Sequence, residues 1–333
     1  MADMNIFQDE AFSVPNLTFT INDMEPVPSR LGSMGLFEEE GVTTTTVQIE
    51  KDGDTLALVP AAERGAPGLV VNGSKRSLIP FNTIHLPERA TIAADQVQGI
   101  RAFGSMTELM GVQAIVNKRL AKMRNQIDAT HEWHRIGAVK GQILDADGTT
   151  VLLDLYDRFK IQQTVFSLDL DKADTDMRLK CAELLDLIED LLPGQTTTGV
   201  RVQCGRQLWM ALLANKSIKE TYLNTQMAAS LRGDPREAID FCGVVFERYR
   251  GKVGKTAYVG DDEGYAIPMG VPGLFQTKFG PADYMDTVNT MGLPYYAQQE
   301  PMDFKKGIML EAQSNPLQIC TRPGAIVKIK LKK

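Results

Sequence analysis

The sequence feature that most constrains the fold is the proline-free stretch from Ser105 to Val139, which has the period of an amphipathic helix. Ser105 and Glu108 have the spacing of a capping box, so the helix is expected to begin near Met106. At about 1.5 Å per residue the stretch makes a rod of roughly 50 Å, which a compact enzyme seldom needs. Its apolar face carries the residues that follow at steps of three or four: Leu109, Val112, Val116, Leu120, Met123, Ile127, His131 and His134.

Composition predicts a folded chain of two or more lobes, because 43% of its 333 residues are hydrophobic and only 23% are charged. The formal net charge of −6 argues against a dedicated nucleic-acid binder, which needs clustered Lys and Arg. The first residues carry acids where a signal peptide is basic, and no long apolar run suggests a membrane span, so a cytoplasmic location is expected. The four cysteines form no CxxC pair, so buried reduced thiols are expected.

Two segments before the helix are expected to extend away from a core. Residues 1–30 contain Pro15, Pro26 and Pro28 without sustained periodicity, which predicts an extended arm. Residues 42–88 hold β-rich runs around Asp-Gly and Asn-Gly turns, which predicts a long double-stranded tongue. Two strands alone are marginal in water, so the tongue is expected to lie on a neighbouring subunit or on its own domain.

The chain beyond the helix alternates between strands and helices, which predicts an α+β lobe. An Asp-Gly turn at 147–148 predicts a hairpin that spans 142–153. A final strand with one wet face is expected where Lys328 and Lys330 alternate with apolar residues. The other expected elements are helices over 169–192, 206–214 and 218–229 and strands over 199–204 and 241–249.

Motifs that could carry chemistry fail on spacing. His131, Glu132 and His134 share a helix, but HExxH needs its second histidine where Arg135 stands, so histidines packed at the helix end are favoured. Gly254-Lys255-Thr256 lacks the first glycine of a phosphate-binding loop. The Asp261–Glu263 run lacks the alternating ligands of a calcium loop. No pattern supports nucleophilic catalysis or a cofactor.

Four segments resemble signature segments of the tailed-bacteriophage major capsid protein E family, the lambda-type major head protein. They are Arg76–Gly104, His131–Ile143, Gly264–Ala297 and Leu310–Leu331. The resemblance implies an α+β protein with the Hong Kong 97-type capsid fold. Its expected parts are an N-terminal arm (1–30), an E-loop (31–90), a peripheral domain (91–170) with a spine helix (105–139), an axial domain (171–281), and return strands of the peripheral domain (282–333).

The resemblance also implies the function of a major head protein, which self-assembles into an icosahedral shell around double-stranded DNA and is not an enzyme. The implied partners are copies of itself in pentamers and hexamers, portal and scaffold proteins, and DNA held by weak non-specific contact, with a decoration protein left open. The implied location is the virion, after assembly in the host bacterial cytoplasm. Two alternatives remain: an encapsulin-like nanocompartment shell, and a soluble metallohydrolase that uses His131 and His134.

Two sets of charged residues are candidate sites. One set on the tongue could form ion pairs between subunits, with solvated charge as an equal alternative: Glu63, Arg64, Lys75 and Arg76. The other set forms a basic stripe on the long helix that could face packaged DNA: Lys118, Arg119, Lys122 and Arg124.

Overall fold

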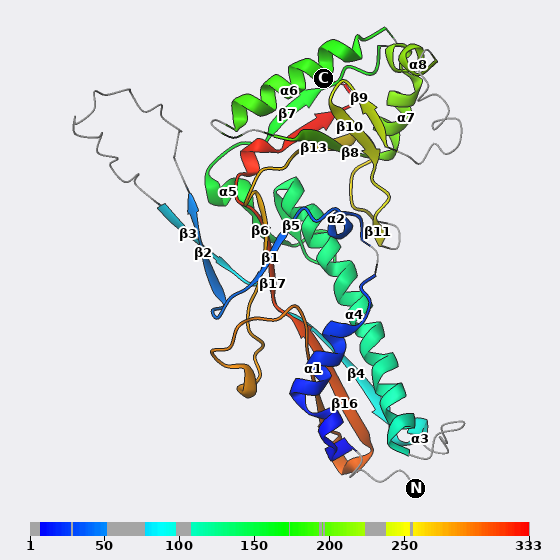
Figure 1. Ribbon diagram of the computed structural model, residues 1–333, viewed down its shortest axis with the longest axis vertical. Helices are drawn as coiled ribbons and strands as arrows, with labels where there is room; N and C mark the ends of the chain where they lie inside the picture. Colours follow the sequence, from blue (N-terminus) through cyan, green and yellow to red (C-terminus); the bar gives the residue numbers. More distant parts are fainter. Residues whose placement is uncertain are drawn as a thin grey trace, which may run out of the picture. The chain divides into compact units, whose positions relative to one another are not determined.

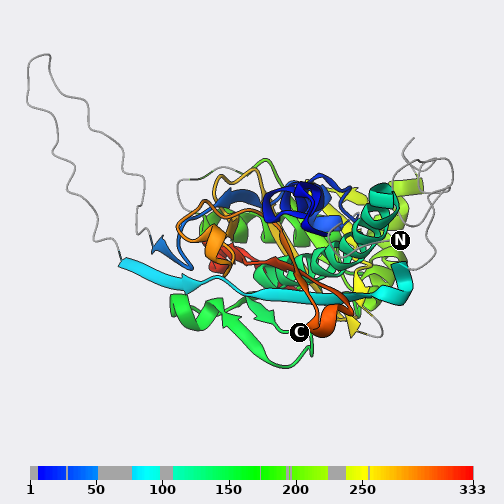
Figure 2. The same ribbon diagram turned by 90° about the horizontal axis from the view of Figure 1, so that it is seen from below.

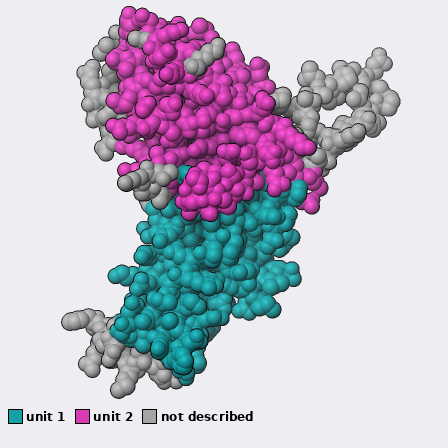
Figure 3. Space-filling model, turned by 180° about the vertical axis from the view of Figure 1, so that it is seen from behind, with its two compact units in different colours: residues 1–47, 80–133, 276–318 teal, residues 48–79, 134–275, 319–333 magenta. Residues whose placement is uncertain are grey.

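The computed structural model describes residues 7–27, 29–51, 77–97, 108–172, 174–192, 195, 197–223, 238–253 and 256–332 (Figure 1). The chain divides into two compact units (Figure 3). Unit 1 comprises residues 1–47, 80–133 and 276–318, and unit 2 comprises residues 48–79, 134–275 and 319–333. Each unit therefore combines three segments that are far apart in the sequence.

Unit 1 is built on a three-stranded antiparallel sheet in the order β15 (Tyr296–Pro301), β16 (Gly307–Ser314) and β4 (Leu86–Ala93). Alternate residues of β16 face the core, and helices α1 (Val14–Asp23) and α4 (Glu108–Lys140) cover this face (Figure 2). The core of the unit is one cluster: Phe12, Leu17, Ile21, Ile92, Val97, Val112, Val116, Leu120, Met123, Ile127, Tyr295, Ala297, Ile308, Leu310 and Ala312.

The long helix is confirmed. It was expected over 105–139, and α4 runs over Glu108–Lys140 as 33 residues, with 105–107 outside the described residues. Val116 and Leu120 of the predicted apolar face are fully buried against the sheet. Helix α4 begins in unit 1 and ends in unit 2.

The expectation of an extended arm over residues 1–30 is wrong for residues 10–12 and 14–23, which are helical. Residues 10–12 form a 3-10 helix, η2 (Glu10–Phe12), and α1 and α2 (Arg30–Ser33) follow. Pro15 lies in the first turn of α1, where a helix tolerates proline because that N–H has no intrahelical acceptor. Leu17 and Ile21, one helical turn apart, are then buried in the core of unit 1.

At the base of the predicted tongue, β2 (Thr46–Lys51) pairs with β3 (Ser77–Asn82). Its residues 52–76 lie outside the described part of the chain. A second small sheet has the order β1 (Glu38–Gly41), β14 (Phe275–Phe279) and β17 (Pro316–Cys320), with β1 parallel to β14. A short helix, α3 (Ala94–Val97), follows β4.

Unit 2 is built on a six-stranded mixed sheet. Its order is β7 (Thr164–Ser167), β18 (Val327–Lys330), β13 (Glu263–Met269), β8 (Gly199–Cys204), β10 (Val244–Arg248) and β9 (Ile239–Phe241). Helices α6 (Met177–Leu191), α7 (Arg206–Ala214) and α8 (Lys216–Leu223) pack with the sheet in one hydrophobic cluster. The smaller elements of unit 2 are α5 (Leu155–Phe159), β11 (Lys252–Val253), β12 (Thr256–Ala257) and η5 (Pro323–Ala325). Two further 3-10 helices, η3 (Met285–Thr287) and η4 (Asp303–Lys305), belong to unit 1.

Several sequence predictions in unit 2 are confirmed, but the single strand expected over 241–249 is wrong, because a turn at Cys242 and Gly243 separates β9 from β10. Residues 224–229 of the helix expected over 218–229 lie outside the described residues. The hairpin β5 (Gln142–Leu144) to β6 (Val151–Asp154) turns at Gly148, which has φ 71°. Helix α6 begins later than expected, because the side chain of Asp176 caps the amide of Arg178 at 2.9 Å. Leu184 and Ile188 of α6 are fully buried, whereas Leu179 is 59% exposed.

The last strand differs from its expected place. The sequence predicted that residues 282–333 return to the peripheral domain with the long helix, but β18 pairs with β13 and β7 in the sheet of unit 2. Val327 and Ile329 are buried while Lys330 is exposed, so the predicted wet face is confirmed.

Candidate functional site

Four polar residues lie in a row along α4 within unit 1, and all are buried. This polar row comprises Arg124, Asp128, His131 and Glu132, which are 5%, 7%, 2% and 6% exposed. Their spacing of three to four residues puts them on adjoining parts of the helix surface. Buried charged groups need hydrogen-bond partners, and the N-terminal segment supplies most of them.

Arg124 holds the end of helix α1. Its Nη1 donates to the backbone carbonyls of Ile21 at 2.7 Å, Asn22 at 3.4 Å and Met24. Carbonyls at a helix C-terminus have no intrahelical donor and attract a cation. The guanidinium also lies 4.9 Å from the ring centroid of Tyr295. Arg124 is thus a packing residue of unit 1, and its expected place in an exposed basic stripe is wrong.

The two carboxylates of the polar row bind the backbone that follows α1. Asp128 accepts from the amide of Val27 at 3.1 Å and from the hydroxyl of Tyr295. Glu132 accepts from the amides of Leu31 at 2.8 Å and Gly32 at 3.3 Å, in the first turn of α2. A carboxylate on these amides satisfies donors that a helix N-terminus leaves unpaired. Val27, Leu31 and Gly32 are therefore fixed along α4.

His131 completes the row by packing. Its Nε2 lies 3.0 Å from Ser314 Oγ, and its ring stacks on Tyr295 with centroids 5.6 Å apart. His131 and Glu132 thus serve the packing of unit 1, which accounts for the apparent metal-binding motif. In the part of the chain that the structure describes, no group of three or more His, Cys, Asp or Glu side chains could hold a metal ion.

The remaining members of the predicted basic stripe lie on the surface of α4. Lys118 and Lys122 are exposed and Arg119 is half-buried, with its Nη2 donating to Gln96 Oε1 at 3.4 Å. The predicted interface residues of the tongue lie outside the described residues: Glu63, Arg64, Lys75 and Arg76.

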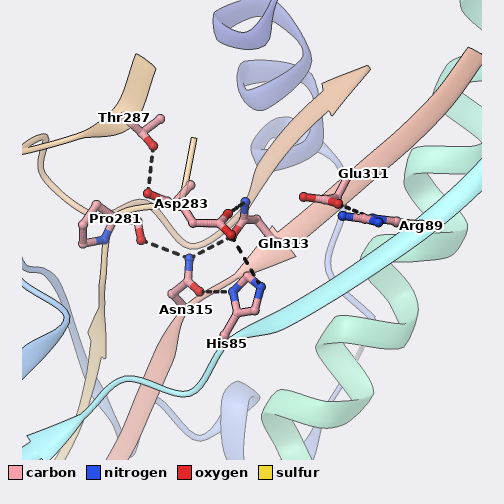
Figure 4. Close-up of polar contacts among 9 residues, drawn as sticks. His85, Arg89, Pro281, Asp283, Thr287, Glu311, Gln313 and Asn315 are labelled. Atoms are coloured by element: carbon pink, nitrogen blue, oxygen red, sulfur yellow. Dashed lines mark hydrogen bonds and ion pairs between the residues drawn. The ribbon is translucent and has the colours of Figure 1, made fainter. Parts of the chain in front are cut away.

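A hydrogen-bonded cluster joins the start of β4 to the chain that follows β14 (Figure 4). Asn315 Nδ2 donates to the Pro281 carbonyl at 3.1 Å and to Gln313 Oε1 at 3.2 Å. This orients Asn315 Oδ1 toward His85 Nδ1 at 2.8 Å, so Nδ1 carries the proton. Gln313 Nε2 in turn donates to Asp283 Oδ1 at 2.6 Å. The cluster fixes the first residues of the following loop.

That loop, residues 283–293, presents apolar side chains on an ordered backbone. Thr287 Oγ1 donates to the carbonyls of Ala282 and Tyr284, each at 3.0 Å. The Gly292 amide donates to the Val42 carbonyl at 3.0 Å. Four of its side chains are exposed, by 89%, 57%, 60% and 42% respectively: Met285, Val288, Met291 and Leu293. We call residues 283–293 the apolar loop.

The tip of the β15–β16 hairpin is a second surface that exposes an apolar side chain. Phe304 is 91% exposed, and Lys305 and Lys306 beside it are exposed too. The Met302 amide donates to the Gly307 carbonyl at 2.9 Å and closes the turn. Lys306 Nζ lies 5.8 Å from the centroid of the Phe304 ring. We call residues 303–306 the hairpin tip.

Three of the four cysteines are buried thiols. Burial raises the pKa of Cys181 and of Cys320 to about 12, and burial raises the pKa of Cys204 as well, so these thiols stay protonated. The expectation of buried thiols holds for these three, whereas Cys242 is exposed in the turn between β9 and β10. No described helix is long and apolar enough to cross a membrane.

The ion pair between Glu263 and Lys328 in unit 2 predicts that the stability of the fold depends on pH. Burial alone would raise the pKa of Glu263, but the hydrogen bond and charge of Lys328 outweigh it, so the pKa of Glu263 is lowered. A depressed carboxyl pKa stabilises the fold above the unfolded pKa of about 4.3 and loses that effect as pH falls. Lys328→Met is therefore expected to lower the Tm at pH 7, and this difference should shrink in calorimetric scans below pH 4. A Tm difference that is independent of pH would contradict the pairing.

Sequence reasoning did not identify the polar row as a group, and it did not single out the apolar loop or the hairpin tip. The polar row could be recognised only after α1 and α2 were placed beside α4, since its partners are about 100 residues away. The hairpin tip carried one local signal, because charged residues and a glycine follow Pro301 from Asp303 to Gly307, a composition typical of turns.

Comparisons with known proteins agree with this architecture. The major capsid protein of Salmonella phage Felix O1 is 26% identical in an alignment of 354 positions, which covers 96% of each chain. That of Pseudomonas phage KPP10 is 24% identical over 319 residues, which cover 89% of this chain and 90% of the relative.

Solved structures show the fold. The crystal structure of a prophage capsid protein from E. coli CFT073 matches with a TM-score of 0.59 at 16% identity, covering 94% of this chain and 96% of that one. The capsid of an empty GTA particle matches with a TM-score of 0.51 at 11% identity, covering 93% of each. The expected Hong Kong 97-type capsid fold is thereby confirmed. The sequence model of the family described as phage major capsid protein E matches residues 13–331, and the chain belongs to that family of shell-forming structural proteins.

Proposed function

We propose that this chain is the major head protein of a tailed bacteriophage and that its copies form the pentamers and hexamers of a closed icosahedral shell around double-stranded DNA. The observation that carries the proposal is the family match over residues 13–331. The described surfaces support it, because the apolar loop and the hairpin tip both expose apolar side chains. A protein that acts as a monomer rarely exposes large apolar patches.

The proposal extends to the partners and the place of assembly. Shell assembly takes place in the host bacterial cytoplasm with portal and scaffold proteins, and a decoration protein can bind the finished shell. The protein acts as a structural component of the virion and not as an enzyme. The family match and the packing roles of His131 and Glu132 support a shell over a metallohydrolase.

Electron microscopy of the expressed chain tests the proposal. Closed shells, sheets or tubes are expected in negative stain, because the contacts are weak individually and repeat over a lattice. Purified virions should contain this chain together with double-stranded DNA. A monodisperse monomer at high concentration would overturn the proposal, and closed shells that hold cargo enzymes would favour the encapsulin-like alternative.

The exposed lysines of α4 are proposed to contact the packaged DNA weakly. Changing both Lys118 and Lys122 to Gln should lower the thermal stability of filled particles and leave empty particles unchanged, because a container needs only non-specific phosphate contact. The exposed pair Lys219 and Lys252, changed to Gln in the same way, serves as a control for the loss of two charges. Equal stability of filled particles in the wild type and the Lys118 and Lys122 variant would refute the contact.

A further inference from the structure

We propose that the hairpin tip of one copy docks on the apolar loop of a second copy of this chain. The proposal rests on the proposed function, because it names the surfaces through which copies meet. Both surfaces belong to unit 1 and consist of described residues.

The hairpin tip has the features of a docking element. Phe304 is 91% exposed, although an aromatic ring gains much from burial. Its backbone has φ 57° and ψ 20°, and Lys305 follows with φ 54°. Consecutive left-handed residues in a hairpin turn are normally Asn or Gly, because other side chains are strained there. An exposed aromatic ring at a strained position indicates a role outside its own chain.

The apolar loop has the features of a receiving surface. Its backbone is held by the hydrogen bonds of Thr287 and Gly292, so little conformational entropy is lost when a partner binds. Met285 and Met291 are flexible side chains that adapt to an aromatic ring and make favourable sulfur contacts with it.

The charges of the two surfaces are complementary. The hairpin tip carries two lysines, Lys305 and Lys306, beside the aromatic ring and one acid, Asp303, so its net charge is positive. The apolar loop carries Asp283 and Asp286, both exposed, and its sequence contains no Lys or Arg. Opposite charges around an apolar centre fix the orientation of a contact more than its strength. A second copy of this chain therefore supplies a partner of the required chemistry.

One copy cannot make this contact with itself. The apolar loop precedes Tyr296 and the hairpin tip follows Pro301, so strand β15 separates them by about 20 Å. Figure 1 shows the two segments, both in orange, at separate places of unit 1. A contact between different patches of identical copies is heterologous, and it closes a ring or continues along a lattice.

Cysteine cross-linking in assembled particles tests the contact. All variants carry Cys242→Ser, which removes the exposed native thiol. Lys306→Cys combined with Asp286→Cys in one chain leaves Phe304 and Met285 in place and should, after mild oxidation, give disulfide-linked dimers and larger species on a non-reducing gel. Each single variant, and Lys306→Cys combined with the exposed Leu179→Cys, should give no ladder.

The outcomes separate this inference from the proposed function. Particles without a ladder in the double variant would overturn the docking and leave the shell function intact. A ladder from Lys306→Cys alone would show that tips meet tips, which also overturns it. Failure of every form of the chain to make particles would overturn the proposed function and the docking together.

A second variant tests whether the strained backbone at Phe304 serves docking rather than the stability of the subunit. Phe304→Asn suits a left-handed turn, so the unassembled subunit should keep or raise its Tm. The yield of particles should fall at least about tenfold, as expected for loss of an aromatic hot spot. An unchanged yield would overturn the docking, and so would a lower Tm, since the ring would then support its own unit.

Discussion

Replacing Arg124 by methionine is expected to lower the free energy of unfolding of unit 1 by about 3–5 kcal/mol, because it leaves a buried charge without its counter-ion. Asp128 is 7% exposed, and its Oδ2 lies 3.9 Å from Arg124 Nε. The carbonyls at the end of α1 would also lose their donor. Thermal or urea unfolding of the unassembled subunit measures the change, and limited proteolysis should show release of the N-terminal segment.

Lys118→Met is the matched control, since it removes a cation from an exposed position of the same helix. Its effect should stay within about 0.5 kcal/mol. If both variants unfold alike, Arg124 is an ordinary surface charge and the fixation of α1 to α4 has been assigned to the wrong residue. A double change of Arg124 and Asp128 to apolar residues should recover part of the loss.

Gly292→Ala is the second change with a large expected effect, because it displaces the apolar loop. A Cβ at this position would lie 1.9 Å from the Phe279 carbonyl oxygen, and backbone atoms cannot give way as a flexible side chain can. The expected destabilisation is about 1–3 kcal/mol. The Gly292 hydrogen bond to Val42 would be broken, so the loop should no longer present Met285 and Met291 in one arrangement. The yield of particles in an assembly assay should fall further than stability alone predicts.

Gly324→Ala provides the comparison for this change. A Cβ there would meet Ile161 Cδ1 at 3.5 Å, an ordinary contact, so both stability and particle yield should remain near those of the wild type. Normal assembly of the Gly292→Ala variant would show that copies meet through other surfaces.

Local patterns in the sequence were sufficient to predict the elements in which buried residues recur at a regular spacing. Helix α4 was predicted within three residues at its described start and one at its end, because Val112, Val116 and Leu120 recur with the helical period. The β5–β6 hairpin followed from Asp-Gly, which supplies the left-handed turn residue Gly148. Such signals need no knowledge of distant residues.

The remaining features depended on partners far away in the sequence. Arg124 belongs to a run of basic residues, and only the placement of α1 beside α4 removes it from the surface. The prolines near the N-terminus suggested an extended chain, yet Pro15 sits where a helix tolerates it. The exposure of Phe304 could not be predicted either. Hydrophobic residues between strands are usually buried by tertiary packing, and the periodicity of the sequence does not show where such packing is absent.

The discontinuous make-up of the two units has a consequence for biosynthesis. In chain order, β16 is the last strand of its sheet in unit 1, and β18 is the last strand of its sheet in unit 2. Neither sheet can close before its last strand has left the ribosome, so a polypeptide truncated before β16 lacks both frameworks at once. Such a fragment could not supply a folded copy to a lattice.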